Sequence, residues 1–305
     1  MQTPPPIPGH LTERVNALCT GTSYEPVGFL GAGGMGQIYV VRHRLLDKRF
    51  ALKAIHPHLL EHASAPERLR IEAQTMARLG HPNIAKVTDF WLAADGSPSF
   101  VMELLTGRNL AAELFERTTL PQEEVIAIGC QALNALGASH AVGIVHRDIK
   151  PENLFLHEAP CHPRVLKVLD FGVARVLEGA PESSPQPLSV PTRAGARVGS
   201  PRFMSPEGRR GEPVDHRADL YSLGLTLYLA LVGTIHFEMT KRDALPPPST
   251  MSAMAISPEL DSALARALRE DPAERYSSAR EFLETLERLA PPRRDRASWN
   301  VRRAP

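Results

Sequence analysis

Four short segments of this 305-residue chain carry residue types that can bind an anion or move a proton. Gly31-Ala-Gly-Gly-Met-Gly36 is mostly glycine, so its backbone N–H groups can approach a phosphate closely. Lys53 adds a cation 17 residues after Gly36. The third segment, His146-Arg-Asp-Ile-Lys-Pro-Glu-Asn153, combines a carboxylate, an ammonium group and an amide, and Asp170-Phe-Gly172 supplies a second carboxylate. Groups of these kinds suit chemistry on a phosphate group.

The glycine segment alone has several explanations, because dinucleotide-binding folds also use Gly-x-Gly-x-x-Gly. Those folds begin a helix directly after the last glycine. Here Gly36 is followed by Gln37-Ile-Tyr-Val-Val41, whose β-branched and aromatic residues favour a strand. The segment therefore favours a glycine-rich hairpin over phosphates, and a tight turn without a ligand remains the alternative.

Lys53 ends the run Phe50-Ala-Leu-Lys53 of a predicted strand. A lysine inside an apolar strand needs an anionic partner, because an unpaired buried charge is costly. Glu72 on the next predicted helix is the candidate. The alternative is an edge-strand lysine whose ammonium group reaches water.

These groups must be positioned by two regions of different character. Strand patterns dominate residues 24–56, 87–92 and 99–104, with one predicted helix over 66–79. The later helices are predicted over 121–141, 216–232, 258–269 and 277–289, and short strand-like runs over 154–157 and 165–169. Strands first and helices later indicate an α+β chain with two lobes.

Bulk composition excludes some classes of protein. Thirty-five Lys and Arg residues against 34 Asp and Glu give a net charge of +1, and 43% of residues are hydrophobic. These values exclude wholesale disorder and give no general basis for nucleic-acid binding. The three cysteines are too few for a disulfide framework and suit a reducing compartment. With no signal peptide evident, we expect a cytoplasmic protein.

Two apolar runs could suggest a membrane span, which needs about 20 mostly apolar residues. Val125–Val145 contains several polar side chains, and Leu220–Ile235 has only 16 residues. We expect both to be buried core helices and the chain to have no membrane partner. Five of the last 15 residues are arginine. We interpret residues 291–305 as a solvated tail, with nucleic-acid binding as the less favoured alternative.

With Ser205-Pro-Glu207 added, the motifs resemble the protein kinase superfamily, most of all the bacterial, eukaryotic-like Ser/Thr kinases. Three further stretches support the resemblance: Leu30–Tyr39, His81–Ile84 and Asp219–Gly224. It covers residues 24–290 and implies a bilobal α+β fold with a β-rich N-lobe and a larger helical C-lobe. The implied organisation is a proline-rich N-terminal lead (1–22), a kinase domain (23–290, with N-lobe 23–104 and C-lobe 105–290) and the Arg-rich tail (291–305).

The resemblance implies transfer of the γ-phosphate of ATP to Ser or Thr hydroxyls of protein substrates, with Mg²⁺ or Mn²⁺ as the metal ion. Asp148 would accept the proton of the hydroxyl group, and Lys150, directed at the transferred phosphate, favours Ser/Thr substrates. Asn153 and Asp170 would hold the metal ions. Lys53 would bind the α- and β-phosphates and pair with Glu72. The glycines implied to cover the phosphates are Gly31, Gly33 and Gly36. The residues implied to contact adenine are Leu30, Ile38, Ala51, the gatekeeper Met102, and the hinge Glu103 to Leu105.

The resemblance also implies regulation through the activation segment, residues 170–207. Arg147 is the residue that can bind a phosphate on that segment. Autophosphorylation there, with a homodimer as one route, is our hypothesis. The candidate acceptors are Ser183, Ser184, Ser189 and Thr192. Glu207 is implied to pair with Arg275.

Two other functions stay open at this point. One is a pseudokinase scaffold that acts by binding, although every catalytic position we can name is filled. The other is a small-molecule phosphotransferase of related fold, which usually lacks the Gly199–Glu207 run. Ser200 stands where these kinases usually have Thr, and Phe203 where Tyr is common. The region after Phe237 is short for the family, which leaves substrate choice open.

Overall fold

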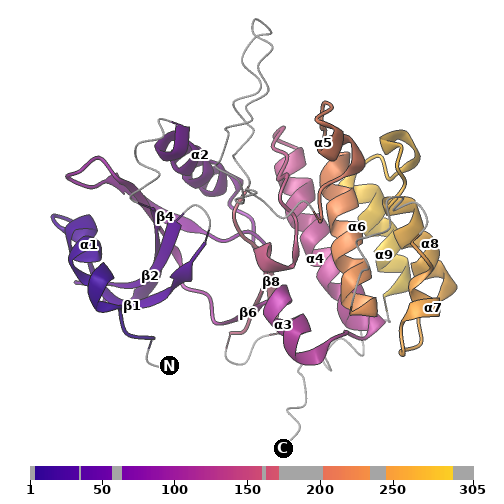
Figure 1. Cartoon of the computed structure of the whole chain (residues 1–305), viewed down its shortest axis with the longest axis horizontal. Coiled ribbons are helices and arrows are strands. Elements are labelled where there is room, and N and C mark those ends of the chain that lie inside the picture. The colour runs from indigo at the N-terminus through magenta and orange to yellow at the C-terminus, as the bar shows by residue number, and fades with distance from the viewer. Residues whose placement is uncertain are drawn as a thin grey trace, which may run out of the picture. The chain divides into compact units, whose positions relative to one another are not determined.

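The computed structural model describes residues 4–33, 36–56, 64–159, 163–171, 202–233 and 245–290 (Figure 1). The chain divides into two compact units, Met1–His81 with Ala85–Thr106, and Pro82–Ile84 with Gly107–Pro305. The first is built around a five-stranded sheet and the second is mainly helical. The predicted α+β class with a strand-rich first part and a helical second part is confirmed. The boundaries of the lead, lobes and tail stay predictions.

The sheet of the first unit has the strand order β1-β2-β3-β5-β4, and all its neighbours are antiparallel. The strands are β1 (Tyr24–Ala32), β2 (Gly36–His43), β3 (Arg49–Ile55), β4 (Val87–Leu92) and β5 (Pro98–Glu103). The helices of this unit are α1 (Gly9–Cys19) and α2 (Ser64–Leu79). The predicted strands at 87–92 and 99–104 and the predicted helix at 66–79 all fall within two residues of observed elements.

The register of β3 shows which residues lie on each face of the sheet. Residues directly opposite in an antiparallel pair share a face. Ala51 pairs with Val40 and Met102, and Lys53 pairs with Ile38 and Phe100. The alternate residues of β3 point to the other face, where Leu52 and Ala54 join a buried cluster that includes α1. Lys53 and the predicted adenine-contacting residues Ala51, Ile38 and Met102 therefore share the face opposite α1.

Helix α1 is packed into the first unit. Val15, Leu18 and Cys19 are at most 2% exposed and belong to the same cluster as Leu52. The indole Nε1 of Trp91 donates a hydrogen bond to the Leu18 carbonyl oxygen at 2.8 Å. Burial raises the pKa of the Cys19 thiol to about 11, so this thiol stays protonated at neutral pH and packs as a small apolar group. Helix α1 therefore covers one face of the sheet with its buried apolar side chains.

We expect Leu18→Ala to destabilise the first unit by about 3 kcal/mol, because it removes a buried side chain and leaves a cavity. The matched control is Leu11→Ala, since Leu11 lies only partly buried at the edge of the same cluster. Thermal unfolding followed by circular dichroism measures both. Equal losses in the two variants would contradict the packing described for α1.

The second unit combines a small antiparallel sheet with a helical core. The sheet has the order β6-β7-β8, with β6 (Gly107–Asn109), β7 (Leu154–His157) and β8 (Val165–Val168). The α-helices are α3 (Leu110–Arg117), α4 (Gln122–His140), α5 (Pro206–Arg210), α6 (Arg217–Val232), α7 (Pro248–Met251), α8 (Pro258–Ala267) and α9 (Ala279–Leu289). Two 3-10 turns, η2 (Pro151–Asn153) and η5 (Pro272–Glu274), complete the described elements. The four long helices predicted after residue 120 are present.

Helix α6 lies at the centre of this unit and packs against α4 and α8 (Figure 1). Its apolar side chains are buried around the whole helix, as expected for a core helix. Gly224 permits the close approach of α8, since a Cβ atom there would lie 2.8 Å from the Cβ of Ala267. Among the residues that the structure describes, no helix is long and apolar enough to cross a membrane.

Helix α3 was not predicted. It has only 8 residues, and its buried positions include the charged Glu113. The Asn109 side chain caps it by accepting a hydrogen bond from the Ala112 N–H at 2.8 Å. Glu113 is stabilised by ion pairs with Arg117 at 3.0 Å and Arg164 at 3.1 Å. A buried carboxylate interrupts the apolar pattern that sequence reading depends on.

Candidate active site

A buried ion pair connects β3 and α2 in the first unit. Lys53 Nζ donates a hydrogen bond to Glu72 Oε1 at 2.7 Å, and the two residues are 5% and 3% exposed. Each charge is costly to bury alone, so each keeps the other ionised. The partner that the sequence indicated for Lys53 is therefore present, and the edge-strand alternative does not apply.

The glycine-rich segment forms the junction of β1 and β2. The Gly33 N–H donates to the Gly36 carbonyl oxygen at 2.8 Å. A Cβ atom at Gly36 would lie 2.2 Å from the Ala54 carbonyl oxygen, so this position has no room for a side chain. Gly31 has φ +155°, which side-chain-bearing residues rarely adopt. Because a strand rather than a helix starts at Gly36, the dinucleotide-binding alternative is wrong.

The predicted adenine-contacting residues are distributed over four strands, β1, β2, β3 and β5, and the residues directly after β5. Ala51 and Met102 are buried and directly paired, whereas Leu30 on β1 is 48% exposed. Glu103 ends β5, and its carboxylate accepts a hydrogen bond from the Lys86 N–H at 2.8 Å. Leu105 follows the strand and is half-buried. The geometry of the first unit thus groups Ala51 and Met102 with Ile38 and fixes the start of the predicted hinge.

Asp148 is held from two sides in the second unit. Lys150 Nζ donates to Asp148 Oδ2 at 2.7 Å. Asn153 Nδ2 donates to the backbone carbonyl oxygen of Asp148 at 2.7 Å and to Oδ2 at 2.9 Å. The side chain of Asp148 remains about one-third exposed, at 35%. The carboxylate is therefore held in place and accessible, as a group that accepts a proton from a hydroxyl group must be.

A buried carboxylate on α6 supports this loop. Asp219 accepts hydrogen bonds from the N–H groups of His146 at 2.8 Å and Arg147 at 2.7 Å, and from His140 Nε2 at 2.8 Å. Burial alone would raise the pKa of Asp219, but its hydrogen bond and charge interaction with His140, followed by His146 and the Arg147 N–H, hold this pKa below its usual value. The sequence indicated Asp219 only as part of the Asp219–Gly224 stretch and did not predict this role.

His146 links the loop to the residue before Asp170. Its Nε2 donates to the Leu169 carbonyl oxygen at 2.9 Å, which leaves Nδ1 to accept from the Asp148 N–H at 3.2 Å. Arg147 and Asp170 have φ values of +65° and +50°, a region uncommon for residues other than glycine. Such strained backbone often occurs where a side chain must be aimed.

The side-chain amide of Asn153 is oriented by Asp148. Both of its hydrogens point to Asp148, so Oδ1 is the atom it can offer to a cation. An amide oxygen and the carboxylate of Asp170 are the donor types that Mg²⁺ and Mn²⁺ prefer. The donor set therefore fits the divalent ion that the sequence predicted.

Part of the predicted site cannot be placed. Gly172, Ser200 and the candidate acceptors Ser183, Ser184, Ser189 and Thr192 lie outside the described residues, as do residues 234–244, which include Phe237 and the first part of the short segment after it. These predictions are untested.

Comparison with known families decides the identity. Residues 24–294 match the family described as "Protein kinase domain". The chain belongs to the protein kinase family. The serine/threonine-protein kinase pkn3 of Myxococcus xanthus is 36% identical over 281 residues, which are 89% of this chain and 50% of pkn3. PknB of Mycobacterium tuberculosis is 34% identical over 298 residues, 92% of this chain and 44% of PknB.

The crystal structure of the Mycobacterium tuberculosis PknI kinase domain is similar in fold, with a TM-score of 0.68 and 28% identity. It covers 90% of this chain, and this chain covers 99% of it. The resemblance to bacterial, eukaryotic-like Ser/Thr kinases is confirmed, and with it the class of Ser/Thr protein kinase. The kinase chain spans half or less of the length of the two curated relatives.

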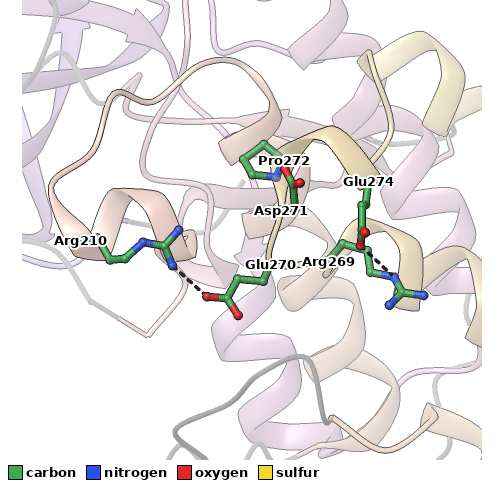
Figure 2. A pocket seen from close by; sticks show the side chains of 6 residues that line it. All are labelled: Arg210, Arg269, Glu270, Asp271, Pro272 and Glu274. Carbon is green, nitrogen blue, oxygen red and sulfur yellow. Dashed lines mark hydrogen bonds and ion pairs between the residues drawn. The ribbon is translucent and has the colours of Figure 1, made fainter.

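The kinase also contains the ion pair implied between Glu207 and Arg275. Two hydrogen bonds of 2.8 Å join the guanidinium group to the carboxylate, and both residues are buried. Beside it lies a surface hollow lined by Arg210, Arg269, Glu270, Asp271, Pro272 and Glu274 (Figure 2). None of the predicted site residues lines this hollow, and its charges are largely exposed.

Proposed function

We propose that this kinase transfers the γ-phosphate of Mg²⁺-bound ATP to Ser and Thr hydroxyls of protein substrates. The observation that carries the proposal is the contact set of Asp148, whose carboxylate is oriented by Lys150 and Asn153 and remains accessible. Bound ATP supplies the phosphoryl group, and the metal ion neutralises its charge. Mn²⁺ is an alternative metal, since its preferred donors are similar.

Each unit contributes side chains to this function. Lys53, kept charged by Glu72, would bind phosphate oxygens, and Gly31, Gly33 and Gly36 would leave room for the phosphates. Asn153 and Asp170 would hold the metal ion together with phosphate oxygens of ATP. Within the described part of the chain, no group of three or more His, Cys, Asp or Glu side chains could hold a metal ion. A metal ion shared with the nucleotide agrees with that observation.

The finer features of the function are also proposals. We infer autophosphorylation of the activation segment at one or more of Ser183, Ser184, Ser189 and Thr192, with a homodimer as one route and Arg147 as the phosphate-binding residue. We infer a role in signalling within the cytoplasm. Mass spectrometry of wild-type protein treated with ATP tests the first of these, and absence of phosphate over residues 183–192 would contradict it.

Transfer of labelled phosphate from ATP and Mg²⁺ to a generic basic protein tests the main proposal. We expect incorporation at Ser and Thr and none without the metal ion, because Asn153 and Asp170 provide ligands for a cation. The pseudokinase alternative predicts no incorporation by the wild-type chain. Transfer only to small molecules would instead favour the related small-molecule phosphotransferases.

A further inference from the structure

A histidine outside the recognised motifs contacts the glycine-rich hairpin. His56 Nε2 lies 2.8 Å from the carbonyl oxygen of Gly33. A carbonyl oxygen can only accept, so His56 donates its Nε2–H. Gly33 also donates its own N–H to Gly36. Both main-chain polar groups of Gly33 are therefore engaged, one within the hairpin and one by His56.

The position of His56 links the hairpin to the strand that carries Lys53. His56 comes directly after Ile55, the last residue of β3, and Ile55 pairs with Gly36. The end of β3 thus holds the hairpin at two places, Gly36 through strand pairing and Gly33 through the imidazole. Because Lys53 lies on the same strand and is fixed by Glu72, both contacts set the hairpin relative to the Lys53 ammonium group.

The other arm of the hairpin is less firmly held. Pairing between β1 and β2 is irregular at two points, between Pro26 and Gly28 and between Phe29 and Gly31. Such irregularities interrupt the ladder of hydrogen bonds and bend the strand. The glycines add further backbone freedom. The hydrogen bond from His56 restricts this freedom at Gly33.

We propose that His56 is a positioning residue for nucleotide binding, and that its Nε2–H holds Gly33 so that the hairpin is preset for the phosphates of ATP. The proposal rests on the proposed kinase function. It gives a role to His56, which belongs neither to the glycine motif nor to the Lys53 motif.

The test compares His56→Leu, which removes the donor, with His56→Gln, whose side-chain amide can donate from a similar position. One hydrogen bond of this kind is worth about 1 kcal/mol, or about a fivefold change in affinity. We expect His56→Leu to raise the KM and Kd for Mg²⁺-ATP about fivefold. The KM for the protein substrate and kcat should change much less. His56→Gln should restore affinity to within about twofold of wild type.

The matched control is His43→Leu in the same unit. His43 Nδ1 accepts hydrogen bonds from the N–H groups of Leu45 at 3.3 Å and Leu46 at 3.2 Å, in the turn between β2 and β3. This variant removes a histidine-to-backbone contact without touching the glycine hairpin. It should lower the melting temperature at least as much as His56→Leu and leave the KM for ATP unchanged.

Three results would overturn the inference: a wild-type KM in His56→Leu, no rescue by His56→Gln, or an equal rise of KM in His43→Leu. Each of these would leave the proposed function in place as long as the wild type transfers phosphate. A wild-type chain that neither binds ATP nor transfers phosphate would overturn the proposed function and this inference together.

Discussion

Asp148→Asn is expected to reduce phosphoryl transfer by about 10²–10⁴-fold, the usual contribution of a positioned general base. The amide has the same shape as the carboxylate but cannot accept the proton of the substrate hydroxyl. Lys150 and Asn153 both donate to Asp148 Oδ2, and the amide oxygen can still accept from one of them. The fold and nucleotide binding should therefore be retained while kcat falls.

Labelled-phosphate incorporation gives the rate, and calorimetric titration with Mg²⁺-ATP shows whether the nucleotide still binds. Glu123→Gln serves as the control, because it makes the same acid-to-amide change at an exposed position in the first turn of α4. It should leave the rate unchanged. Equal rates for wild type and Asp148→Asn would remove Asp148 from its assigned role, and no incorporation by either would favour the scaffold.

The parts of the site that could be predicted are those contained in short contiguous segments. Asp148, Lys150 and Asn153 lie within six residues, and their mutual hydrogen bonds are local. The Lys53–Glu72 pair could be predicted because a lysine in an apolar strand needs an anionic partner, and Glu72 lies on the next helix. Strand and helix positions followed from hydrophobic periodicity.

The missed features are contacts between a side chain and a distant main chain. Asp219 lies 73 residues from His146 and binds its backbone N–H, a group that every non-proline residue has. No residue type at position 146 could therefore indicate the contact. The same holds for His56 with Gly33. Helix α1 showed a partial apolar pattern, but its partner face on the sheet depends on strand order, which the sequence does not state.

Arg275→Met is expected to destabilise the second unit by about 3–5 kcal/mol, because it leaves a buried carboxylate without its cation. Arg275 is 2% exposed and Glu207 4%. Besides its two bonds to Glu207, the guanidinium group donates to the carbonyl oxygens of Arg269 at 2.7 Å and Glu270 at 2.8 Å. All these acceptors lose their partner at once. For a unit of this size the melting temperature should fall by about 10 °C.

Two control variants separate the effect of burial on the melting temperature from the effect of charge. Arg210→Met removes the exposed pair with Glu270 (Figure 2), whose side chains are 44% and 55% exposed. Exposed pairs contribute about 0–1 kcal/mol, so the melting temperature should hardly change. The second control is the double variant Glu207→Gln with Arg275→Met. It removes the Glu207 charge that Arg275→Met leaves unpaired, so it should be more stable than Arg275→Met alone. A double variant that is less stable would show that lost packing, and not the unpaired carboxylate, causes the destabilisation.

The destabilisation caused by Arg275→Met should depend on pH, in a direction set by the pKa of Glu207. Burial alone would raise the pKa of Glu207, but the hydrogen bonds from Arg275 hold it below its usual value of 4.5. Its stabilising contribution is therefore present above about pH 4.5 and is lost as the pH falls through the lower pKa of the folded state. In Arg275→Met burial is opposed only by the hydrogen bonds from the Glu207 N–H and Ser205, so the carboxyl group binds a proton at a higher pH than in the wild type. The difference in melting temperature between the two proteins should be largest at pH 7 and narrow at pH 4. A difference that stays constant over this range would show that the charge of Glu207 contributes nothing to the effect.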